Sequence, residues 1–287
     1  MNAPLAFMDP AAAGLQIGGA AARALSLELD TWPKPGLVSP FDCGSHDDMD
    51  AAMLLRSIAV LEPFLINLAE AGAAEADMAT LRRIGIAAEA AMLRATRGVN
   101  THRGAIFGLG LLCAACGATA NGLEPKAARL GNIVRSRWGA AIRHMPVDCT
   151  SHGAVAVRRY GARGARLEAA SGFPSVYEVG LPALRAGLAL SGGDAEAARV
   201  QACFALIAVL DDTNLLHRGG SDGLAFARRE ARHFLESGGV GLAGWRDRAA
   251  QTHRAFVERH LSPGGAADVL AMALFVCSVE GRLQVAV

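Results

Sequence analysis

Several features that would mark other classes of protein are scarce in this sequence of 287 residues. Lys and Arg total 28 against 27 Asp and Glu, which leaves a formal net charge of +1. No basic excess therefore indicates binding to nucleic acid or to an anionic membrane. Aromatic residues make up only 5%, whereas β-strands favour aromatic and β-branched residues. The six cysteines are too sparse at this length for a disulfide scaffold.

No segment reads as an export signal or a membrane anchor. The N-terminus, MNAPLAFMDPAAAG, lacks the basic and apolar regions of a signal peptide. The longest apolar runs, Ala105–Cys116 and Cys203–Leu210, are shorter than the roughly 18–20 residues that span a bilayer. Cys113 and Cys116 form a single C-x-x-C motif, and we interpret them as small buried hydrophobic residues of a helix. We expect a cytoplasmic protein with reduced thiols that binds neither a membrane nor nucleic acid.

Several nucleotide and hydrolase motifs are also absent. The sequence contains no G-x-x-x-x-G-K-[ST] and no G-x-G-x-x-G after a strand, which argues against a P-loop or a Rossmann site. It contains neither a G-x-S-x-G elbow nor an H-E-x-x-H motif.

The residues that are abundant favour helices. Apolar residues make up 52% of the chain; they are mostly Ala, Leu and Val, and Ala and Leu lead the helix propensity ranking. Apolar positions recur at helical spacing through most of the sequence. We predict an all-α fold, a single-domain multi-helix bundle over residues 13–287 that follows a flexible tail over residues 1–12. The expected helices are Gln16–Asp30, Asp48–Ala71, Asp77–Thr96, Ala105–Ala120, Glu124–Arg137, Ala154–Arg159, Val179–Ser191, Ala195–Leu210, Gly223–Ser237, Gly244–Leu261 and Gly265–Val279.

Polar loops between these helices are the candidate functional segments. They are rich in Gly, Asn and Asp, which turns require, but also in His and Arg, which turns do not require. Binding groups collect on such loops when a rigid scaffold holds them. The five loops are Lys34–Asp50, Gly98–Gly104, Asp148–Gly153, Gly161–Ser175 and Asp211–Gly220.

The pair Asp211 and Asp212 suggests a metal. Both carboxylates follow a predicted helix directly, and the negative end of a helix dipole disfavours anions by about 0.3–1 kcal/mol each. Oxygen ligands close together in sequence suit a hard cation such as Mg²⁺. The alternative is a solvated helix end. Asn214, His217 and Arg218 follow in the same loop, so groups that bind anions lie beside the acidic pair.

Two further loops open helices and are predicted to bind anions, because the first turn of a helix offers free N–H groups. Simple helix capping is the alternative reading for each loop. Lys34 lies on a turn stiffened by prolines, and Glu168 near Arg163 is either a general acid or base or one half of an ion pair. The residues of the two helix-opening loops are Asn100, Thr101, His102, Arg103, Ser151 and His152.

Six ordered blocks of the sequence together resemble the triphosphoribosyl-dephospho-coenzyme-A synthase family. Two of them, with Ser39-Pro40 and Ser45-His46, are more similar to the branch of the family that serves malonate decarboxylase than to the branch that serves citrate lyase. The blocks are Lys34–Pro40, Ser45–Asp50, Gly98–Gly104, Thr150–Gly153, Gly172–Val176 and Asp212–Gly220.

The resemblance implies a glycosyl transfer in which ATP and 3′-dephospho-CoA give 2′-(5″-triphosphoribosyl)-3′-dephospho-CoA and free adenine. The product is the precursor of a prosthetic group for the acyl carrier protein of malonate decarboxylase, with handover to a holo-acyl-carrier-protein synthase. An oxocarbenium-like transition state requires a base, an acid and nearby carboxylates, for which the candidates are Glu168, Asp211, Asp212 and His102. Mg²⁺ on Asp211 or Asp212 would hold the triphosphate, with Lys34, Arg103 and Arg218 on its oxygens. Asn100, Thr101, Ser151, His152, Arg163, Asn214 and His217 complete the predicted substrate-binding set.

Three alternatives remain open at this point. The same synthase activity could serve citrate lyase. ADP-ribosylglycohydrolases are also all-α, use acidic Asp-Asp-Thr turns with Mg²⁺ and hydrolyse an N-glycosidic bond. A third alternative is a carrier-protein chaperone without catalysis, in which the loops hold a nucleotide for regulation.

Overall fold

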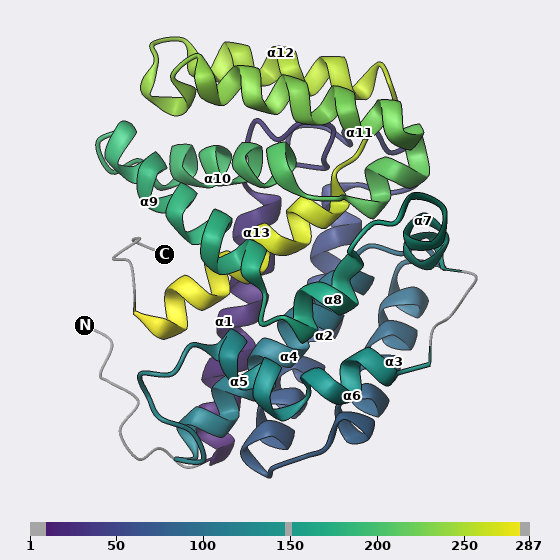
Figure 1. Ribbon diagram of the computed structural model, residues 1–287, viewed down its shortest axis with the longest axis vertical. Helices are drawn as coiled ribbons and strands as arrows, with labels where there is room; N and C mark the ends of the chain where they lie inside the picture. Colours follow the sequence, from purple (N-terminus) through teal and green to yellow (C-terminus); the bar gives the residue numbers. More distant parts are fainter. Residues whose placement is uncertain (1–9, 147–150, 282–287) are drawn as a thin grey trace.

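The fold is built from α-helices, as the sequence predicts. A computed structural model describes residues 10–146 and 151–281, without the side chains of residues 10, 11 and 152, and it contains no β-strand within those ranges. Figure 1 shows α11 and α12 at one end of the molecule and α2 to α6 toward the other, with α13 crossing the middle. The helices are α1 (Pro10–Leu29), α2 (Ala51–Ala73), α3 (Met78–Ala95), α4 (Arg103–Ala120), α5 (Leu130–Arg137), α6 (Gly139–His144), α7 (His152–Tyr160), α8 (Gly164–Ala170), η1 (Ser175–Gly180), α9 (Leu181–Leu190), α10 (Ala195–Val209), α11 (Thr213–Glu236), η2 (Gly239–Gly241), α12 (Trp245–Val257) and α13 (Gly264–Glu280).

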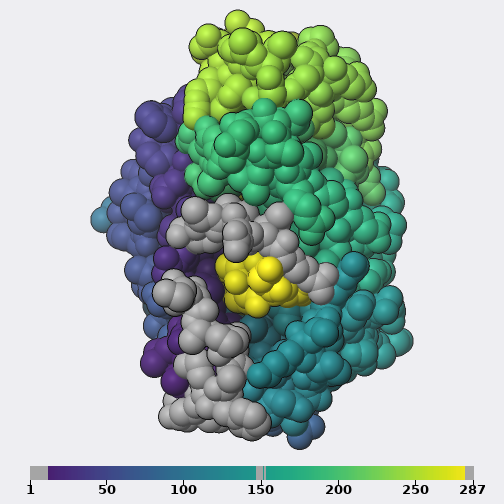
Figure 2. Space-filling model, turned by 90° about the vertical axis from the view of Figure 1, so that its left-hand side faces the viewer, coloured from purple at the N-terminus to yellow at the C-terminus, as the bar shows by residue number. Residues whose placement is uncertain are grey.

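Two apolar helices form the centre of the core. α4 buries an unbroken run from Gly108 to Ala118, and α13 buries a run from Val269 to Cys277. α13 packs against α1, α4 and α10, and its far end reaches the surface between the purple N-terminal helix and the green and teal helices in Figure 2. Cys113 and Cys116 are fully enclosed on α4, and burial raises the pKa of Cys116 to about 12. The interpretation of this pair as core residues is confirmed.

Two helices of the described chain, α2 and α4, are long and apolar enough to cross a membrane by length and composition. This is weak evidence for a span, because a core helix passes the same test and 72% of the apolar window of α4 is buried.

Several predicted helix boundaries are wrong, and at Leu130 a contact from a residue distant in the sequence explains the difference. The helix expected from Glu124 begins only at Leu130, whose N–H donates to the Glu280 side chain of α13 at 2.9 Å. A cap from a distant helix therefore sets this start. The predicted loop 161–175 contains α8, and the predicted loop 211–220 is helical from Thr213. Gly220, with φ +62° and ψ −159°, breaks α11 into two helical pieces, a conformation that favours glycine.

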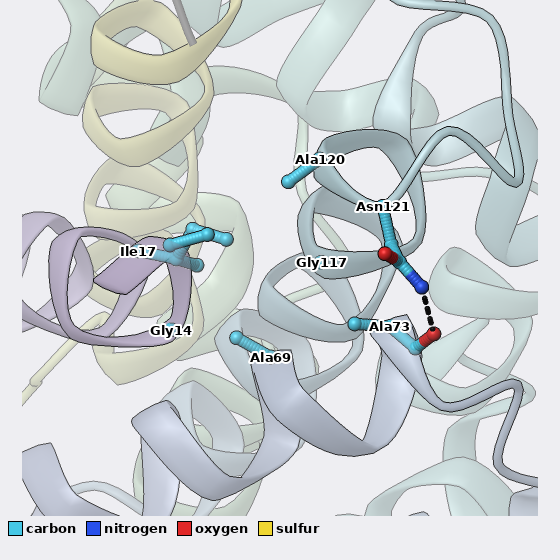
Figure 3. Close-up of a pocket in the computed structure, with 8 residues that line it drawn as sticks. Gly14, Ile17, Ala69, Ala73, Gly117, Ala120 and Asn121 are labelled. Carbon is cyan, nitrogen blue, oxygen red and sulfur yellow. Dashed lines mark hydrogen bonds between the residues drawn. The ribbon is translucent and has the colours of Figure 1, made fainter. Parts of the chain in front are cut away.

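α2 and α4 cross in backbone contact through small residues. A Cβ on Gly117 would overlap the carbonyl oxygen of Ala69, and one on Gly72 would overlap that of Ala114. Figure 3 shows Gly117 facing α2 beside a cavity of about 10 Å³, where Asn121 Nδ2 donates to the Ala73 carbonyl at 2.9 Å. This cavity has room for no more than about one water molecule.

We expect Gly117→Ala to lower the free energy of unfolding by about 1–3 kcal/mol, because the added methyl forces the two helices apart. Gly85→Ala in α3 is the matched control: no atom lies within 4 Å of the position of its new Cβ, and replacing a helical glycine should stabilise the protein by about 0.5–1 kcal/mol. Urea unfolding measures both changes. Equal effects of the two substitutions would show that the α2–α4 contact tolerates a wider crossing.

Candidate functional site

Asp212 begins a helix and does not follow one. α10 ends at Val209, and Asp212 is the N-cap of α11, where its Oδ1 accepts the N–H groups of Asn214 at 2.9 Å and Leu215 at 3.2 Å. The premise that this carboxylate opposes a helix dipole is therefore wrong, because a helix N-terminus favours an anion. The chain between the two helices is too short for the sequence to show which helix Asp212 belongs to.

The same carboxylate also holds the start of α13. Asp212 Oδ2 accepts the N–H of Ala266 at 2.9 Å, and a Cβ on Gly265 would lie 2.9 Å from that oxygen. Asp212 is 3% exposed. Burial raises the pKa of Asp212, and the backbone N–H groups of both helices act against that rise. One buried carboxylate thus joins the N-terminal turns of α11 and α13.

Asp268, in the first turns of α13, is a second carboxylate at this point. Its oxygen lies where a Cβ of Gly104 would be, and it accepts a hydrogen bond from the Ala105 backbone at the start of α4. Burial raises the pKa of Asp268 well above its ordinary value, and the charges of Asp212 and Glu28 add to the rise. Sequence reasoning missed this residue, although the run Ser-Pro-Gly-Gly just before it is a sequence signal for an unusual helix start.

Lys34 lies inside the protein and not on an exposed turn. It is fully buried, and its Nζ donates to Glu28 Oε1 at 2.6 Å and to the Glu28 carbonyl at 2.5 Å. After burial, its charge also lowers the pKa of His102. Burial raises the thiol pKa of Cys203; the charge of Lys34 lowers it, and the charges of Glu28 and Asp212 raise it. These groups therefore share one interior region.

This buried region contains more carboxylates than cations. Within the described residues, Lys34 pairs with Glu28, whereas Asp212 and Asp268 accept backbone N–H groups, and the charges of Glu28 and Asp212 act on Asp268. Burying charge without a partner is costly. The region accordingly favours an additional positive charge.

His102 is held by a chain of hydroxyl groups. Its Nδ1 lies 2.7 Å from Ser57 Oγ, and the Thr101 hydroxyl donates to Ser57 Oγ at 2.8 Å. Burial, and then the charge of Lys34, lower the pKa of His102 to about 4. The imidazole is therefore neutral near pH 7, which suits it to hydrogen bonding rather than to donating a proton as an acid. Ser57, buried within α2, carries no sequence signal that distinguishes it from a core residue.

Arg218 connects two of the predicted loops. Its guanidinium donates to the carbonyls of Ser45 at 2.9 Å and His260 at 3.1 Å, and lies 3.0 Å from His46 Nδ1. His46 Nε2 in turn lies 2.8 Å from Ser262 Oγ, just before α13. The structure thus brings the loop after Lys34, the start of α11 and the start of α13 together.

The other predicted binding residues lie at helix starts. Asn100 Oδ1 accepts the N–H of Arg103 at 3.1 Å, and the Arg103 guanidinium pairs with Glu89 of α3. Ser151 caps α7 by accepting the N–H of Ala154 at 3.3 Å. Asn214 lies in the first turn of α11, where a Cβ on Gly264 would lie 2.7 Å from its Nδ2, and His217 is exposed one turn later. His152 begins α7, but its side chain and Thr150 fall outside the described residues.

Two predicted catalytic carboxylates have other partners. Asp211 Oδ1 pairs with Arg228 at 2.7 Å. Glu168 Oε1 accepts the N–H of Ser175 at 2.7 Å and closes the turn after α8; burial raises its pKa, against the charge of the exposed Arg163. Across residues 10–146 and 151–281, no hydrogen bond or ion pair links either side chain to Asp212 or Asp268.

Helix N-termini and buried carboxylates lie together in this region. The N-terminal turns of α4, α11 and α13 meet at Asp212 and Asp268, and Gly153 of α7 approaches Thr213 of α11. Helix N-termini attract phosphates, and carboxylates stabilise the positive charge that develops on a reacting sugar ring. Both kinds of group meet here.

We expect Asp212→Ala to lower the free energy of unfolding by roughly 1–4 kcal/mol, because it removes caps worth about 0.5–2 kcal/mol from each of two helices. Asp194→Ala is the matched control, since Asp194 is exposed and caps one helix, α10; its other partner is the exposed Arg246 at 3.4 Å, a surface ion pair of little weight. Chemical denaturation should show the larger loss for Asp212→Ala. A loss no greater than that of Asp194→Ala would mean that the hydrogen bond from Asp212 to α13 adds nothing to the free energy of unfolding.

Comparisons with known proteins agree on one family. A family model described as ATP:dephospho-CoA triphosphoribosyl transferase matches residues 15–286. A relative from Pectobacterium atrosepticum named 2-(5''-triphosphoribosyl)-3'-dephosphocoenzyme-A synthase is 41% identical, over 90% of this chain and 87% of its own length. Relatives with the same name marked as probable, from Stutzerimonas stutzeri and Acinetobacter calcoaceticus, are 40% and 37% identical over at least 95% of each chain. No solved structure matches the chain. The chain therefore belongs to the ATP:dephospho-CoA triphosphoribosyl transferase family, a family of transferases.

Proposed function

We propose that this chain joins ATP to 3′-dephospho-CoA, releasing adenine and forming 2′-(5″-triphosphoribosyl)-3′-dephospho-CoA. Family membership supports this reaction. The observation that carries it is the meeting of three helix N-termini at two buried carboxylates, Asp212 and Asp268. Free N–H groups at a helix start bind phosphates, and carboxylates stabilise a reacting ribose. Asp212 and Asp268 already accept several N–H groups of these first turns, so the triphosphate would use the others.

The reaction is a displacement at C1″ of the ATP ribose. The 2′-hydroxyl oxygen of dephospho-CoA forms a bond to C1″, and the hydroxyl proton is transferred to a base. The bond from C1″ to adenine breaks with its electron pair leaving on adenine, which takes up a proton from an acid. Positive charge develops on the ribose ring in the transition state, and a preorganised negative group lowers its energy. We assign this electrostatic role to Asp212 and Asp268. A single displacement on the β-linked ribose of ATP gives an α-linkage in the product.

His102 is assigned a hydrogen bond to a substrate and not a proton transfer. Its ring is neutral near pH 7, because burial and the charge of Lys34 lower its pKa to about 4. Its Nδ1 is already bound to Ser57 at 2.7 Å, so Nε2 is the atom available to a ligand. The predicted roles of Glu168 and Asp211 in proton transfer stay predictions.

The triphosphate would lie at the first turns of α4 and α11, with Asn214 and Arg218 beside it. Arg103 and Arg218 hold protein partners, which a triphosphate would replace. Lys34 contributes its charge from the interior, since its Nζ is held by Glu28. Asn100, Thr101, Ser151, His152, Arg163 and His217 remain predicted substrate contacts.

We also propose Mg²⁺ as the counter-ion of the triphosphate. The side chains of Asp211 and Asp212 face different partners, Arg228 and the start of α13, and within the described chain no three acidic, His or Cys side chains form a complete metal site. Mg²⁺ usually binds one or two carboxylates and completes its shell with substrate phosphates and water. Asp212 with Asp268 fits that pattern, and the excess of buried carboxylates over Lys34 favours a divalent cation. Mg²⁺ would supply charge neutralisation for the triphosphate.

The biological role we propose is in the cytoplasm, for malonate decarboxylase. Ser39-Pro40 and Ser45-His46 support this branch over the one that serves citrate lyase. The product would pass to a holo-acyl-carrier-protein synthase for attachment to the carrier protein.

We expect one adenine for each product molecule, and only when both substrates are present. Chromatography of the reaction mixture measures adenine and pyrophosphate, and NMR of the anomeric proton identifies the linkage. Neither phosphate nor pyrophosphate should appear, because the triphosphate stays on the ribose. Adenine release from ATP alone would indicate a hydrolase, and pyrophosphate released in step with adenine would rule out the reaction.

Asp268→Asn tests whether the reaction takes place at the proposed site. We expect it to reduce adenine release by about 100-fold or more, the usual effect of losing one preorganised electrostatic group. Asp247→Asn is the matched control, because Asp247 lies in the first turn of α12 but is exposed. Equal activity of the two folded variants would remove Asp268 from the site.

A further inference from the structure

The loop between α1 and α2 presents an aromatic ring to solvent. Phe41 is 70% exposed, the most exposed large hydrophobic side chain in the described part of the chain. Scattered exposed apolar residues are common on protein surfaces, so exposure alone does not indicate a site. The structure around Phe41 gives the additional reason.

The loop that carries Phe41 is fixed by hydrogen bonds. Ser39 Oγ accepts the N–H groups of Phe41 at 3.2 Å and Asp42 at 3.3 Å, and the Ser39 N–H donates to the Asp42 carbonyl at 3.0 Å. Asp42 Oδ1 accepts the N–H of Gly44 at 2.8 Å and lies 3.1 Å from His253 Nε2 of α12. The backbone therefore holds the phenyl ring in water, although burial of apolar area is favourable.

Phe41 belongs to a row of three rings. The centroids of Phe41 and Trp32 lie 5.4 Å apart with their planes 38° from parallel, and Trp32 meets His253 edge-on at 4.9 Å. Trp32 is half-buried. Phe41 and Trp32 thus make an aromatic surface with one side supported by the protein and one side open.

The aromatic row lies close to the backbone of Lys34. Trp32 lies two residues before Lys34, at most about 7 Å along an extended chain. His253 Nδ1 lies 2.6 Å from the Lys34 carbonyl, so the ring that supports Trp32 also holds the backbone of Lys34. Through His253 the aromatic row therefore lies beside the backbone of Lys34, whose ammonium group pairs with Glu28 in the buried charged region.

We infer that Trp32 and Phe41 form a shelf on which the adenine ring of a nucleotide substrate stacks. This rests on the proposed function, in which both substrates, ATP and dephospho-CoA, carry adenine. Bases stack on aromatic side chains through their faces, without the need for a matching set of hydrogen bonds. The shelf accounts for the exposed ring, the rigid loop and the place of both beside Lys34.

Binding of each substrate alone tests the shelf without turnover. Trp32 fluorescence is the probe: ATP or dephospho-CoA should quench it, inorganic tripolyphosphate should not, and Trp32→Phe should remove the change. Phe41→Ala should raise the Kd of at least one of the two nucleotides by about 5- to 150-fold, the range that corresponds to the loss of about 1–3 kcal/mol of stacking. Phe41→Tyr should keep the Kd within about 3-fold, because it retains a stacking ring. Leu15→Ala, which removes another exposed apolar side chain from α1, is the matched control.

Measuring the two nucleotides separately shows whether the adenine on the shelf is that of ATP or that of dephospho-CoA. A higher Kd for ATP places the departing adenine on the shelf, and a higher Kd for dephospho-CoA places the adenine of the acceptor there. Unchanged Kd values for both in folded Phe41→Ala would overturn the inference, as would equal quenching by tripolyphosphate. A failure of the proposed reaction would appear as absent adenine release with the binding changes intact, so the two failures are distinguishable.

Discussion

The buried carboxylate of Asp212 is the interaction on which the site depends. It accepts N–H groups from α11 and from α13, two helices that start more than fifty residues apart in the chain. Because α13 is also a core helix, the same carboxylate that caps the start of α11 also holds this end of the core. Asp268 then comes to Gly104 at the start of α4, since it lies in the turn of α13 that Asp212 anchors. Two side chains, Asp212 and Asp268, thus connect three helix starts.

This arrangement combines stabilising helix caps with the cost of burying carboxylates. Carboxylates without a matching number of cations are costly to bury, and the pKa values of both Asp212 and Asp268 are raised by that burial. The helix caps that Asp212 provides to α11 and α13 offset part of that cost. Groups with shifted pKa values are frequent at sites that bind a charged ligand.

The sequence was sufficient for the helical class, for most helix positions and for the family. Apolar spacing identifies α2, α3, α4, α10 and α13 within a few residues, and the six loop blocks resemble a family that the comparisons confirm. The sequence-based prediction failed where a contact from a distant element sets a helix start or the direction of a side chain. Leu130 starts a helix because Glu280 caps it, and Lys34 points inward because Glu28, at the end of the preceding helix, receives it. Asp268 and Ser57 lie on helices that read as core, so only the packing shows that they face polar partners.

A crystal structure of the chain with ATP and Mg²⁺, without dephospho-CoA, would locate the substrate. We expect the triphosphate to lie against the first turns of α4 and α11, with the ribose beside Asp212 and Asp268. The rival location is an open groove of about 510 Å³ on α11 that is lined by Arg228, Arg229, Arg232 and His233. Arg228 and Arg232 already bind the last carbonyls of α10, so we assign them to the fold. A triphosphate bound in that groove, with the three helix starts empty, would show that Asp212 and Asp268 do not form the substrate site.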